Sequence, residues 1–482
     1  MLTAGTAEVP RFVSVLHIDF VSEKSYNSTV TLIKNTELYI MNAGPVKVVK
    51  FGGSSLADAE HFRQVQSIIA ADPARRYAVP SAPGKRFDGD IKVTDMLYHC
   101  YNLASEGEDF TDAFAKIEER YLDIIRGLGL DLDLSEEFAV IKNAFHYHAG
   151  SDYAASRGEY LNGLILAKLM GYDFLDAAKV IKFYDNGTFD AEKTNIILSD
   201  RLTRHERAVI PGFYGSMPNG TIKTFARGGS DITGSIVARA SGATLYENWT
   251  DVSGFLMADP RIVKDPCVIE VITYQELREL SYMGAGVLHE DAIFPVRIAE
   301  IPINIRNTNK PQDPGTMIVP GTSEYDREKV ITGIAGKKGF SVLQIEKDQM
   351  NTEIGFGRRV LEVIENEGAT FEHLPSGIDT MGVILSSDMS EHTRKNILDG
   401  ICETCEPESI SFEDGIALIA VVGRGMVRAK GTAARVFRAI AEADINIRMI
   451  DQGSSEISII IGVNEADFER ALNAIYEEFV PQ

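Results

Sequence analysis

The sequence is poor in cysteine, in positive charge and in long hydrophobic runs, and each shortage excludes a class of protein. Four cysteines in 482 residues do not make the disulfide framework of a secreted domain, so we expect a reducing, cytoplasmic compartment. The sequence contains no run of about eighteen apolar residues, and therefore no segment that predicts a membrane span. Its formal net charge is −22, with 48 basic against 70 acidic residues, which argues against nucleic acid or an anionic membrane as a partner.

One close pair of cysteines is present, Cys402 and Cys405, in a C-x-x-C arrangement. A zinc site would need two further ligands, and the remaining cysteines, Cys100 and Cys267, form no second pair. The spacing therefore favours ordinary thiols over a metal or redox site, and we expect no resident metal.

The first 43 residues carry no basic start, and His17 and Asp19 interrupt their apolar run, so they do not resemble a signal peptide. They form either a loosely attached arm or the result of an upstream start choice. The second interpretation is favoured because Met41 could itself be the start, and the domain pattern described below begins after it.

A chain of this length predicts two to four domains. Residues 44–308 alternate strand-like with helix-like stretches, and we expect helices over 96–128 and 154–171. This alternation predicts an α/β domain with a mainly parallel sheet, in which ligands bind at loops beyond the carboxyl ends of the strands. Residues 309–330 contain several prolines and glycines and predict a linker.

The stretch Val46–Ser55 predicts a site for an anion. A valine-rich strand ends at Lys50 and Phe51, Gly52 and Gly53 form a turn, and apolar residues then recur at helical spacing. Glycines let the backbone approach a ligand, and free N–H groups point outward from the start of a helix. A lysine at the strand end can reach a phosphate, whereas the alternative is an ordinary tight turn beside a surface lysine.

Residues 223–231 repeat this combination of a cation, two glycines and a serine before a helical pattern. The cation here is Arg227, and an arginine suits a bidentate grip on a carboxylate or phosphate. Asp231, at the end of the stretch, could alternatively be a plain helix cap. Two such elements in one domain are harder to dismiss than one.

A third stretch, residues 249–261, places charged groups around turn residues. These groups are Asp251, Asp259 and Arg261. Taken alone, the pattern favours a solvated loop over a binding site.

Beyond the linker the chain repeats itself at an offset of 76 residues. The repetition pairs Met350 with Met426, Gly355 with Gly431, Val360 with Val436, Ile364 with Ile440, Gly377 with Gly453 and Ile384 with Ile460. This pattern predicts two copies of one small α+β module, at residues 331–410 and 411–482. Neither copy carries a nucleophile beside a base, so we expect binding or assembly modules; a repeat that serves only dimer contacts is the alternative.

The three charged stretches resemble the signature segments of aspartokinases, a family of the amino-acid kinase superfamily, and the repeated modules resemble their tandem C-terminal ACT modules. The resemblance runs from Val46 to the end of the sequence. It implies a three-layer α/β kinase domain with a mainly parallel central sheet, followed by two ferredoxin-like α+β ACT domains. It also implies transfer of the γ-phosphoryl group of ATP, with Mg²⁺ carried by the nucleotide, to the side-chain carboxylate of L-aspartate. The product, 4-phospho-L-aspartate, would open the route to lysine, diaminopimelate, threonine and methionine.

The same resemblance implies roles for residues at matching positions. The catalytic residues would be Lys50, at the transferring phosphate, and Asp231, which would organise the catalytic cations. ATP would be bound by Lys50, Gly52, Gly53, Ser54, Thr250, Asp251 and Arg261. L-aspartate would be held by Ser81, Thr94, Glu159, Arg227, Gly228 and Ser230. Within this set Glu159 would take the amino group and Arg227 the α-carboxylate.

For the ACT modules the resemblance implies feedback by an end-product amino acid, lysine in the first place and threonine beside or instead of it. The effector would face Met350, Gly355, Phe356, Thr370 and Glu372. The modules would also pair chains into a homodimer or tetramer. Because nothing follows the second module in the sequence, we expect no fusion with homoserine dehydrogenase.

Two positions depart from the family pattern. Leu256 stands where many aspartokinases have a tyrosine near the nucleotide, and Gly286 stands where many have a lysine. Lys223 or another cation could substitute for that lysine, and we expect His289 to be structural. The departures motivate a competing hypothesis, a non-catalytic amino-acid sensor that keeps the fold.

The implied reaction needs no general base. A free aspartate carboxylate has a pKa near about 3.9 and is already ionised at neutral pH. This agrees with a sequence in which no Ser/His/Asp or Cys/His arrangement stands out. Positioning and cationic screening would therefore carry the phosphoryl transfer.

Overall fold

The structure is a computed structural model that describes residues 44–226, 228–285, 288, 290–321 and 329–480. The chain divides into two units, Met1–Pro45 and Val46–Gln482, and the helices and strands named below lie in the second unit. The extension predicted at residues 1–43 lies outside the described residues.

An eight-stranded sheet forms the centre of the first part of this unit. In spatial order its strands are β3 (Asp173–Phe174), β4 (Ala208–Val209), β2 (Arg75–Pro80), β1 (Lys47–Phe51), β7 (Leu245–Thr250), β9 (Ile303–Asn307), β10 (Thr316–Val319) and β8 (Val271–Thr273). Neighbouring strands run parallel except β9 and β10, which are antiparallel. The prediction of a mainly parallel sheet is confirmed.

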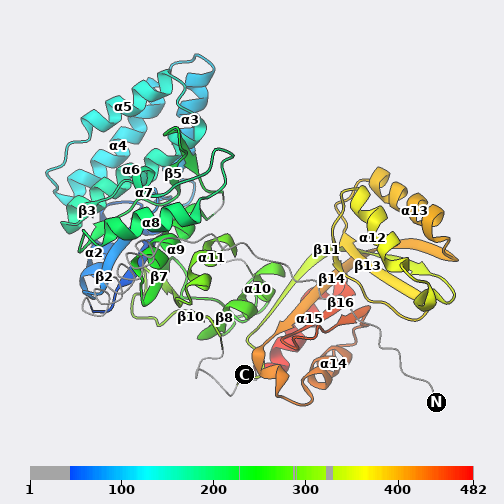
Figure 1. Cartoon of the computed structure of the whole chain (residues 1–482). Helices are drawn as coiled ribbons and strands as arrows, with labels where there is room; N and C mark the ends of the chain where they lie inside the picture. Colours follow the sequence, from blue (N-terminus) through cyan, green and yellow to red (C-terminus); the bar gives the residue numbers. More distant parts are fainter. Residues whose placement is uncertain (1–43, 227, 286–287, 289, 322–328, 481–482) are drawn as a thin grey trace, which may run out of the picture. The chain divides into compact units, whose positions relative to one another are not determined.

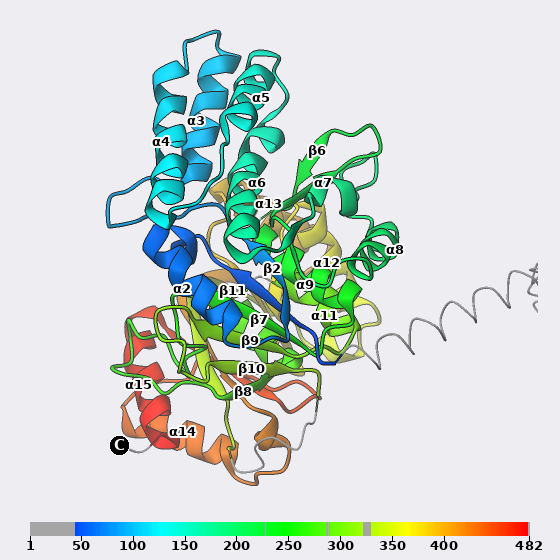
Figure 2. The same cartoon turned by 90° about the vertical axis from the view of Figure 1, so that its left-hand side faces the viewer.

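Helices cover both faces of this sheet (Figures 1 and 2). They are α2 (Ala59–Ala70), α3 (Val93–Ser105), α4 (Thr111–Leu128), α5 (Ser135–His146), α6 (Ser151–Met170), α7 (Ala177–Val180), α8 (Ala191–Leu202), α9 (Gly229–Ser241), α10 (Tyr274–Tyr282) and α11 (Glu290–Ile298). Along β1, Val49 and Phe51 join a hydrophobic cluster with α2 to α6, whereas Val48 joins another with α7 to α11. Successive side chains of a strand point to opposite faces, so the sheet has a core on each side and the domain has three layers.

The helix predicted over residues 96–128 is two helices, α3 and α4. The chain breaks between them because Gly107 adopts a left-handed backbone with φ 77°. Phe110 then turns inward and packs against Phe114 and Phe145 in the core. The helix predicted over residues 154–171 corresponds to α6.

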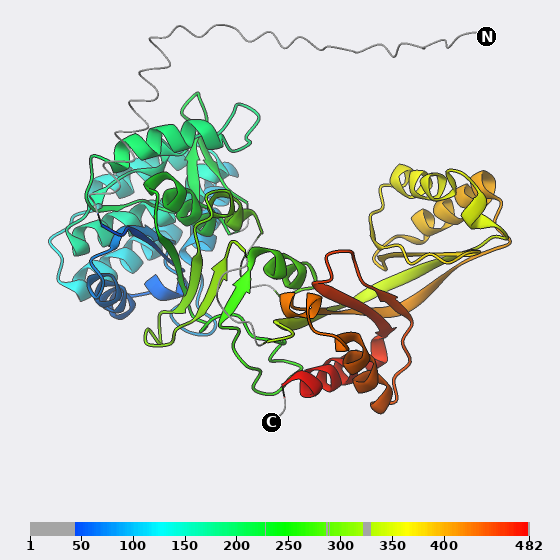
Figure 3. The same cartoon turned by 60° about the horizontal axis from the view of Figure 1, so that its bottom comes forward.

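A second, six-stranded sheet follows. Its order is β12 (Phe371–His373), β13 (Thr380–Ser386), β11 (Gly333–Glu346), β14 (Ser409–Val422), β16 (Ser458–Asn464) and β15 (Met449–Asp451). Its helices are α12 (Phe356–Asn366), α13 (Glu391–Cys405), α14 (Thr432–Glu442) and α15 (Phe468–Phe479). The helices of the two copies lie at opposite ends of the long strands β11 and β14 (Figure 3).

The internal repeat is visible in this sheet. Helices α12 and α14 start and end 76 residues apart, and each follows a glycine in the left-handed region, Gly355 with φ 80° and Gly431 with φ 86°. The later strands β13 and β16 start 78 residues apart, because the loop before β15 is longer by two residues than the loop before β12. The predicted pairings of Gly377 with Gly453 and of Ile384 with Ile460 are therefore wrong by two residues.

The two copies share their long strands. The first half of β11 pairs with the second half of β14, and the second half of β11 pairs with the first half of β14, with the register shifting near Phe340. The boundary predicted between residues 410 and 411 falls inside β14, which runs without a break from Ser409 to Val422. Each copy thus takes one strand from the stretch assigned to the other.

Candidate functional site

The turns after β1 and β2 meet at the carboxyl edge of the parallel sheet. Gly52 donates its N–H to the carbonyl of Trp249 at 3.0 Å, and Gly84 donates to the carbonyl of Gly53 at 2.8 Å. A Cβ atom on Gly53 would lie 2.8 Å from the carbonyl oxygen of Ala82, so only glycine permits this approach of the two turns. The edge predicted from the glycine-rich turns is therefore a real meeting point of loops.

Lys50 and Asp231 form an ion pair across this edge. The ammonium of Lys50 lies 2.5 Å from Oδ1 of Asp231 and 3.4 Å from Oδ1 of Asn248. The amide of Asn248 donates to the same Oδ1 of Asp231 at 2.9 Å. Lys50 is buried, with 8% of its surface exposed, which excludes the alternative of a surface lysine.

Asp231 is not a helix cap either. The residue that caps α9 is Gly228, whose φ of 71° is left-handed, and Asp231 lies within the first turn. Its carboxylate instead receives the two bonds from β1 and β7. Sequence reasoning found Lys50 and Asp231 but missed Asn248, which stands directly opposite Lys50 in the parallel register of β1 and β7.

Glu159 lies in the middle of α6 and is buried, with 6% of its surface exposed. Burial raises the pKa of its carboxyl to about 8, although a backbone hydrogen bond from Ala82 and the charge of Arg157 oppose the shift. Its Oε2 atom has no hydrogen-bond partner among the described residues. A buried carboxylate oxygen without a partner is unfavourable unless a cationic group completes the site.

The predicted substrate residues on the turn after β2 and on α3 lie beside Glu159. The amide of Asn162, one turn along α6, donates to the carbonyl of Ser81 at 2.7 Å. A Cβ atom on Gly158 would lie 2.7 Å from the Cβ of Ala82 and 3.8 Å from Oγ1 of Thr94. The structure thus brings Ser81, Thr94 and Glu159 together.

The start of α9 packs against the turn after β4. A Cβ atom on Gly212 would lie 2.5 Å from Oγ of Ser230, and Gly212 donates its N–H to the carbonyl of Pro80 at 3.1 Å. Gly228 and Ser230 therefore reach the same edge as the turn after β2. Arg227 lies outside the described residues, so its predicted grip on a carboxylate stays a prediction.

The predicted nucleotide residues divide into two groups. Ser54 follows the β1 turn, and Thr250 and Asp251 lie at the end of β7, where Oγ1 of Thr250 donates to Oδ1 of Asp251 at 3.1 Å. Arg261 lies in an exposed loop and donates to the carboxylate of Asp259, two residues before it. The structure records this local pairing for Arg261 and no contact with the Lys50 cluster among the described residues.

The two departures noted in the sequence are only partly described. Leu256 is half-buried and forms an isolated β-bridge with Val268. Gly286 and His289 lie outside the described residues. Lys223, suggested as a substitute cation, pairs with Asp152 at 2.8 Å.

The residues predicted to face an effector differ in exposure. Met350 and Phe356 are buried in the core of the first copy, beside the left-handed Gly355. Thr370 is exposed, and Glu372 is half-buried. The carboxylate of Glu372 accepts a hydrogen bond from the hydroxyl of Tyr282, the last residue of α10.

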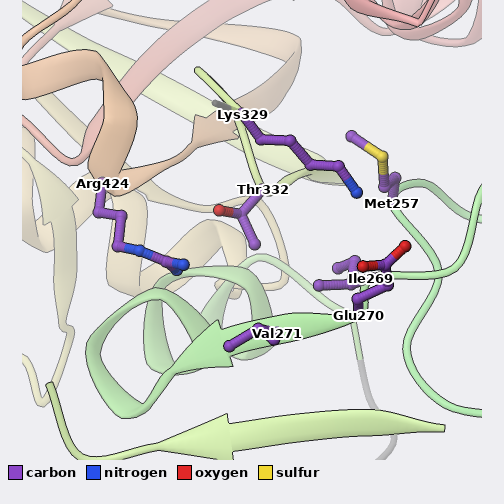
Figure 4. Close-up of a pocket in the computed structure, with 7 residues that line it drawn as sticks. All are labelled: Met257, Ile269, Glu270, Val271, Lys329, Thr332 and Arg424. Carbon is purple, nitrogen blue, oxygen red and sulfur yellow. The ribbon is translucent and has the colours of Figure 1, made fainter. Parts of the chain in front are cut away.

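A second link joins α10 to the regulatory part. Glu276, fully buried, forms a capping box with Thr273 at the start of α10. It also accepts a hydrogen bond from Oγ1 of Thr332 at 2.6 Å and pairs with the guanidinium of Arg424 at 2.7 Å. Figure 4 shows Thr332 and Arg424 beside a small hollow, which is also lined by Lys329, Met257, Ile269, Glu270 and Val271.

The described residues contain no group of three or more His, Cys, Asp or Glu side chains that could hold a metal ion. Among the helices they form, none combines the length and apolarity that crossing a membrane requires. Cys402 and Cys405 are free thiols, one exposed and the other buried.

Comparison with known proteins gives consistent matches. The model of the amino acid kinase family matches residues 45–307, and an ACT domain model matches residues 419–479. Aspartokinase 3 of Bacillus subtilis is 38% identical over 454 residues, which cover 90% of this chain and 98% of that protein. The crystal structure of aspartate kinase from Clostridium acetobutylicum matches with a TM-score of 0.83 and 50% identity, over 90% of this chain and 100% of that one.

More distant structures share the fold. E. coli aspartokinase III has been solved in complex with aspartate and ADP and in complex with lysine and aspartate. Both structures are 24% identical to this chain, cover 90% of it and 99% of their own chain, and give TM-scores of 0.67 and 0.66. The predicted fold class, a kinase domain followed by ACT-type modules, is confirmed.

Proposed function

Because the chain belongs to the aspartokinase family, the aspartate kinases, we propose that it transfers the γ-phosphoryl group of ATP to the side-chain carboxylate of L-aspartate. The observation that carries this proposal is the buried Lys50, held by Asp231 and Asn248 where the ends of β1 and β7 meet the start of α9. Lys50 supplies a fixed cation beside the glycine turn, where we propose that a phosphate binds.

The chemistry follows from charge. An oxygen of the ionised substrate carboxylate attacks the γ-phosphorus, the bond from that phosphorus to the bridging oxygen breaks, and ADP leaves with the electron pair. Lys50 neutralises charge that the transferring phosphoryl group carries, and no proton has to be removed. When bound with the nucleotide, Mg²⁺ would supply further charge neutralisation. Asp231 would be the residue that holds this ion, because one carboxylate together with phosphate oxygens suits Mg²⁺. The bonds from Lys50 and Asn248 both use Oδ1 of Asp231, so neither of these residues occupies Oδ2.

We assign selection of the amino acid to charges at the two ends of the substrate backbone. Glu159 would receive the ammonium group, because its enclosed Oε2 atom needs a cationic partner. Arg227 would receive the α-carboxylate, and Ser81, Thr94, Gly228 and Ser230 would line the pocket between them.

We assign the nucleotide to the turn after β1 and the end of β7. Gly52, Gly53 and Ser54 would surround the phosphates, and Thr250, Asp251 and Arg261 would bind the rest of the nucleotide. The ADP complex of E. coli aspartokinase III favours ATP as the co-substrate. Arg261 would have to release Asp259 to take part, because the two side chains are paired in the structure.

The proposal is tested by formation of aspartyl hydroxamate from purified protein with MgATP, L-aspartate and hydroxylamine. Lys50→Met should lower turnover by roughly two orders of magnitude or more. Lys47→Met is the matched control, because Lys47 lies at the other end of the same strand and pairs with Asp72. Product from glutamate but not aspartate would reassign the substrate, and near-normal turnover of the Lys50 variant would reject its role.

We further propose that lysine, with or without threonine, inhibits the enzyme by binding at the ACT modules near Met350, Gly355, Phe356, Thr370 and Glu372. The carboxylate of Glu372 suits a cationic side chain, and the lysine complex of E. coli aspartokinase III supports such regulation. The pathway products and the pairing into a homodimer or tetramer belong to the same proposal. Activity assays with lysine, threonine and both test it, together with light scattering.

The alternative of a non-catalytic sensor predicts a different outcome. Calorimetry would then show binding of lysine without any binding of ATP. The intact cluster of Lys50, Asp231 and Asn248 favours the enzyme, because a sensor would not require this arrangement.

A further inference from the structure

A second cavity, of about 420 Å³, lies among α8, α9, α10 and α11, and Lys50, Asp231 and Glu159 are not among its lining residues. Helix α9 packs against both α8 and α11, and Figure 2 shows these three helices grouped together. The volume is in the range of small-molecule sites. The walls are mainly aromatic and aliphatic, and include Phe225, Ile232 and Ile293.

Among the described residues that line this cavity, the charged side chains are all arginines. Arg239, Arg278 and Arg297 line it, and the described lining contains no aspartate or glutamate. This is unexpected in a chain with a net charge of −22. The guanidinium of Arg297 lies 5.6 Å from the ring centroid of Phe294, so positive charge and apolar wall adjoin each other.

We propose that this cavity binds a small organic anion with an apolar body, of the class of aromatic or branched-chain carboxylates. The body would pack against Phe225, Ile232 and Ile293. The carboxylate would face Arg239 and Arg297, whose planar groups suit bidentate hydrogen bonds. A carboxylate would gain ionic contacts with Arg239 and Arg297 that a fully apolar ligand cannot make, and a cation would be repelled. Charge complementarity therefore selects the ligand class.

The cavity also adjoins the proposed active site. Ala226 and Ile232 both line it, and the chain between them carries Ser230 and Asp231. A ligand that contacts both ends of this segment favours one arrangement of it, so we expect occupancy to change the KM for aspartate. This coupling rests on the proposed function, whereas binding in the cavity does not.

The test uses 3-phenylpropionate as the probe, with calorimetry on the full chain. Two comparison compounds separate the contributions: 3-phenylpropylamine keeps the body and reverses the charge, and propionate keeps the charge and lacks the ring. We expect the probe to bind at least about tenfold more tightly than either compound. Equal affinity for the amine, or no binding of the probe, would overturn the proposal.

Variants locate the binding. Arg239→Met and Arg297→Met should each lower the affinity for the probe about fivefold or more, because each substitution keeps an unbranched aliphatic side chain and removes the charge. Arg126→Met is the matched control, on the exposed face of α4, and should leave binding unchanged. Unchanged melting temperatures would show that the variants fold. Loss of affinity in the control alone, or in none of the variants, would place the probe elsewhere and refute the site.

Kinetics separate the two parts of the proposal. Binding of the probe with an unchanged KM for aspartate would refute the coupling, while the proposal that the cavity binds the probe would still hold. Binding to a protein without kinase activity would refute the proposed function and leave the site. If this face instead pairs two copies of the chain, Arg297→Met would change the oligomeric state measured by light scattering and the probe would not bind the wild type, and the proposal would fail.

Discussion

The pH dependence of aspartate binding should follow the ionisation of Glu159. Its carboxyl has a pKa of about 8 in the unliganded structure, because it is buried. If only the ionised form accepts the substrate ammonium, about one molecule in ten carries an ionised Glu159 at pH 7. Ionising Glu159 then reduces the binding free energy of aspartate by about 1.4 kcal/mol at this pH. The KM for aspartate should therefore fall about tenfold per pH unit up to pH 8 and level off above it.

Glu159→Gln removes the titrating group while keeping its shape. We expect its KM for aspartate to exceed that of the wild type by roughly ten- to hundredfold at pH 8.5, because a hydrogen bond to a charged partner is lost, a term of about 1.5–3 kcal/mol. The dependence on pH should disappear in this variant. The assay is steady-state hydroxamate formation between pH 6 and 8.5, corrected for titration of the substrate amine.

A thermal measurement without substrate separates this role from a structural one. The pKa of Glu159 is raised on folding, so the folded protein holds the proton more tightly than the unfolded chain. Its contribution to stability is full below the ordinary glutamate pKa and is lost as pH rises toward 8. The wild type should therefore lose melting temperature relative to Glu159→Gln between pH 5 and 8. A wild-type KM that is flat with pH, or a slope that persists in the variant, would refute the reasoning.

Three further changes test other contacts. Asn248→Ala should lower kcat about tenfold in the hydroxamate assay with little change in KM, because it frees both Lys50 and Asp231 from a shared partner. Arg424→Met should lower the free energy of unfolding by about 3–5 kcal/mol in denaturant titration, because it leaves the buried Glu276 without its charge partner. Tyr282→Phe should lower the lysine concentration for half-inhibition, because Glu372 no longer bonds to the tyrosine hydroxyl; an unchanged value would reject that link.

The sequence was sufficient for contacts that local patterns encode. Lys50 and Asp231 were predicted because a strand, a glycine turn and a helix start each have a recognisable pattern. Asn248 was missed because its role depends on the register of β7 beside β1, which places it opposite Lys50 and which no local pattern specifies. A search for polar residues at matching positions on adjacent predicted strands could have found it.

The regulatory sheet shows the same limit. The repeat at 76 residues located α12 and α14 correctly, because helix faces leave a strong periodic pattern. It could not show that β14 crosses the boundary drawn at residue 410, since one continuous strand can pair with different partners along its length. A fixed offset also could not reveal that the loop before β15 is two residues longer than the loop before β12.

Helix α10 is bonded to the regulatory part at both ends. At its start, Glu276 is both the capping-box residue and the acceptor for Thr332 and Arg424, so the first turn of the helix cannot shift without breaking a buried ion pair. At its end, Tyr282 bonds to Glu372. Burial together with this bond raises the pKa of Tyr282 to about 12, so the hydroxyl remains a donor at physiological pH. A ligand that competes for Glu372 would release one end of α10 while the other stays fixed, which favours rotation of the helix about Glu276 over its dissociation.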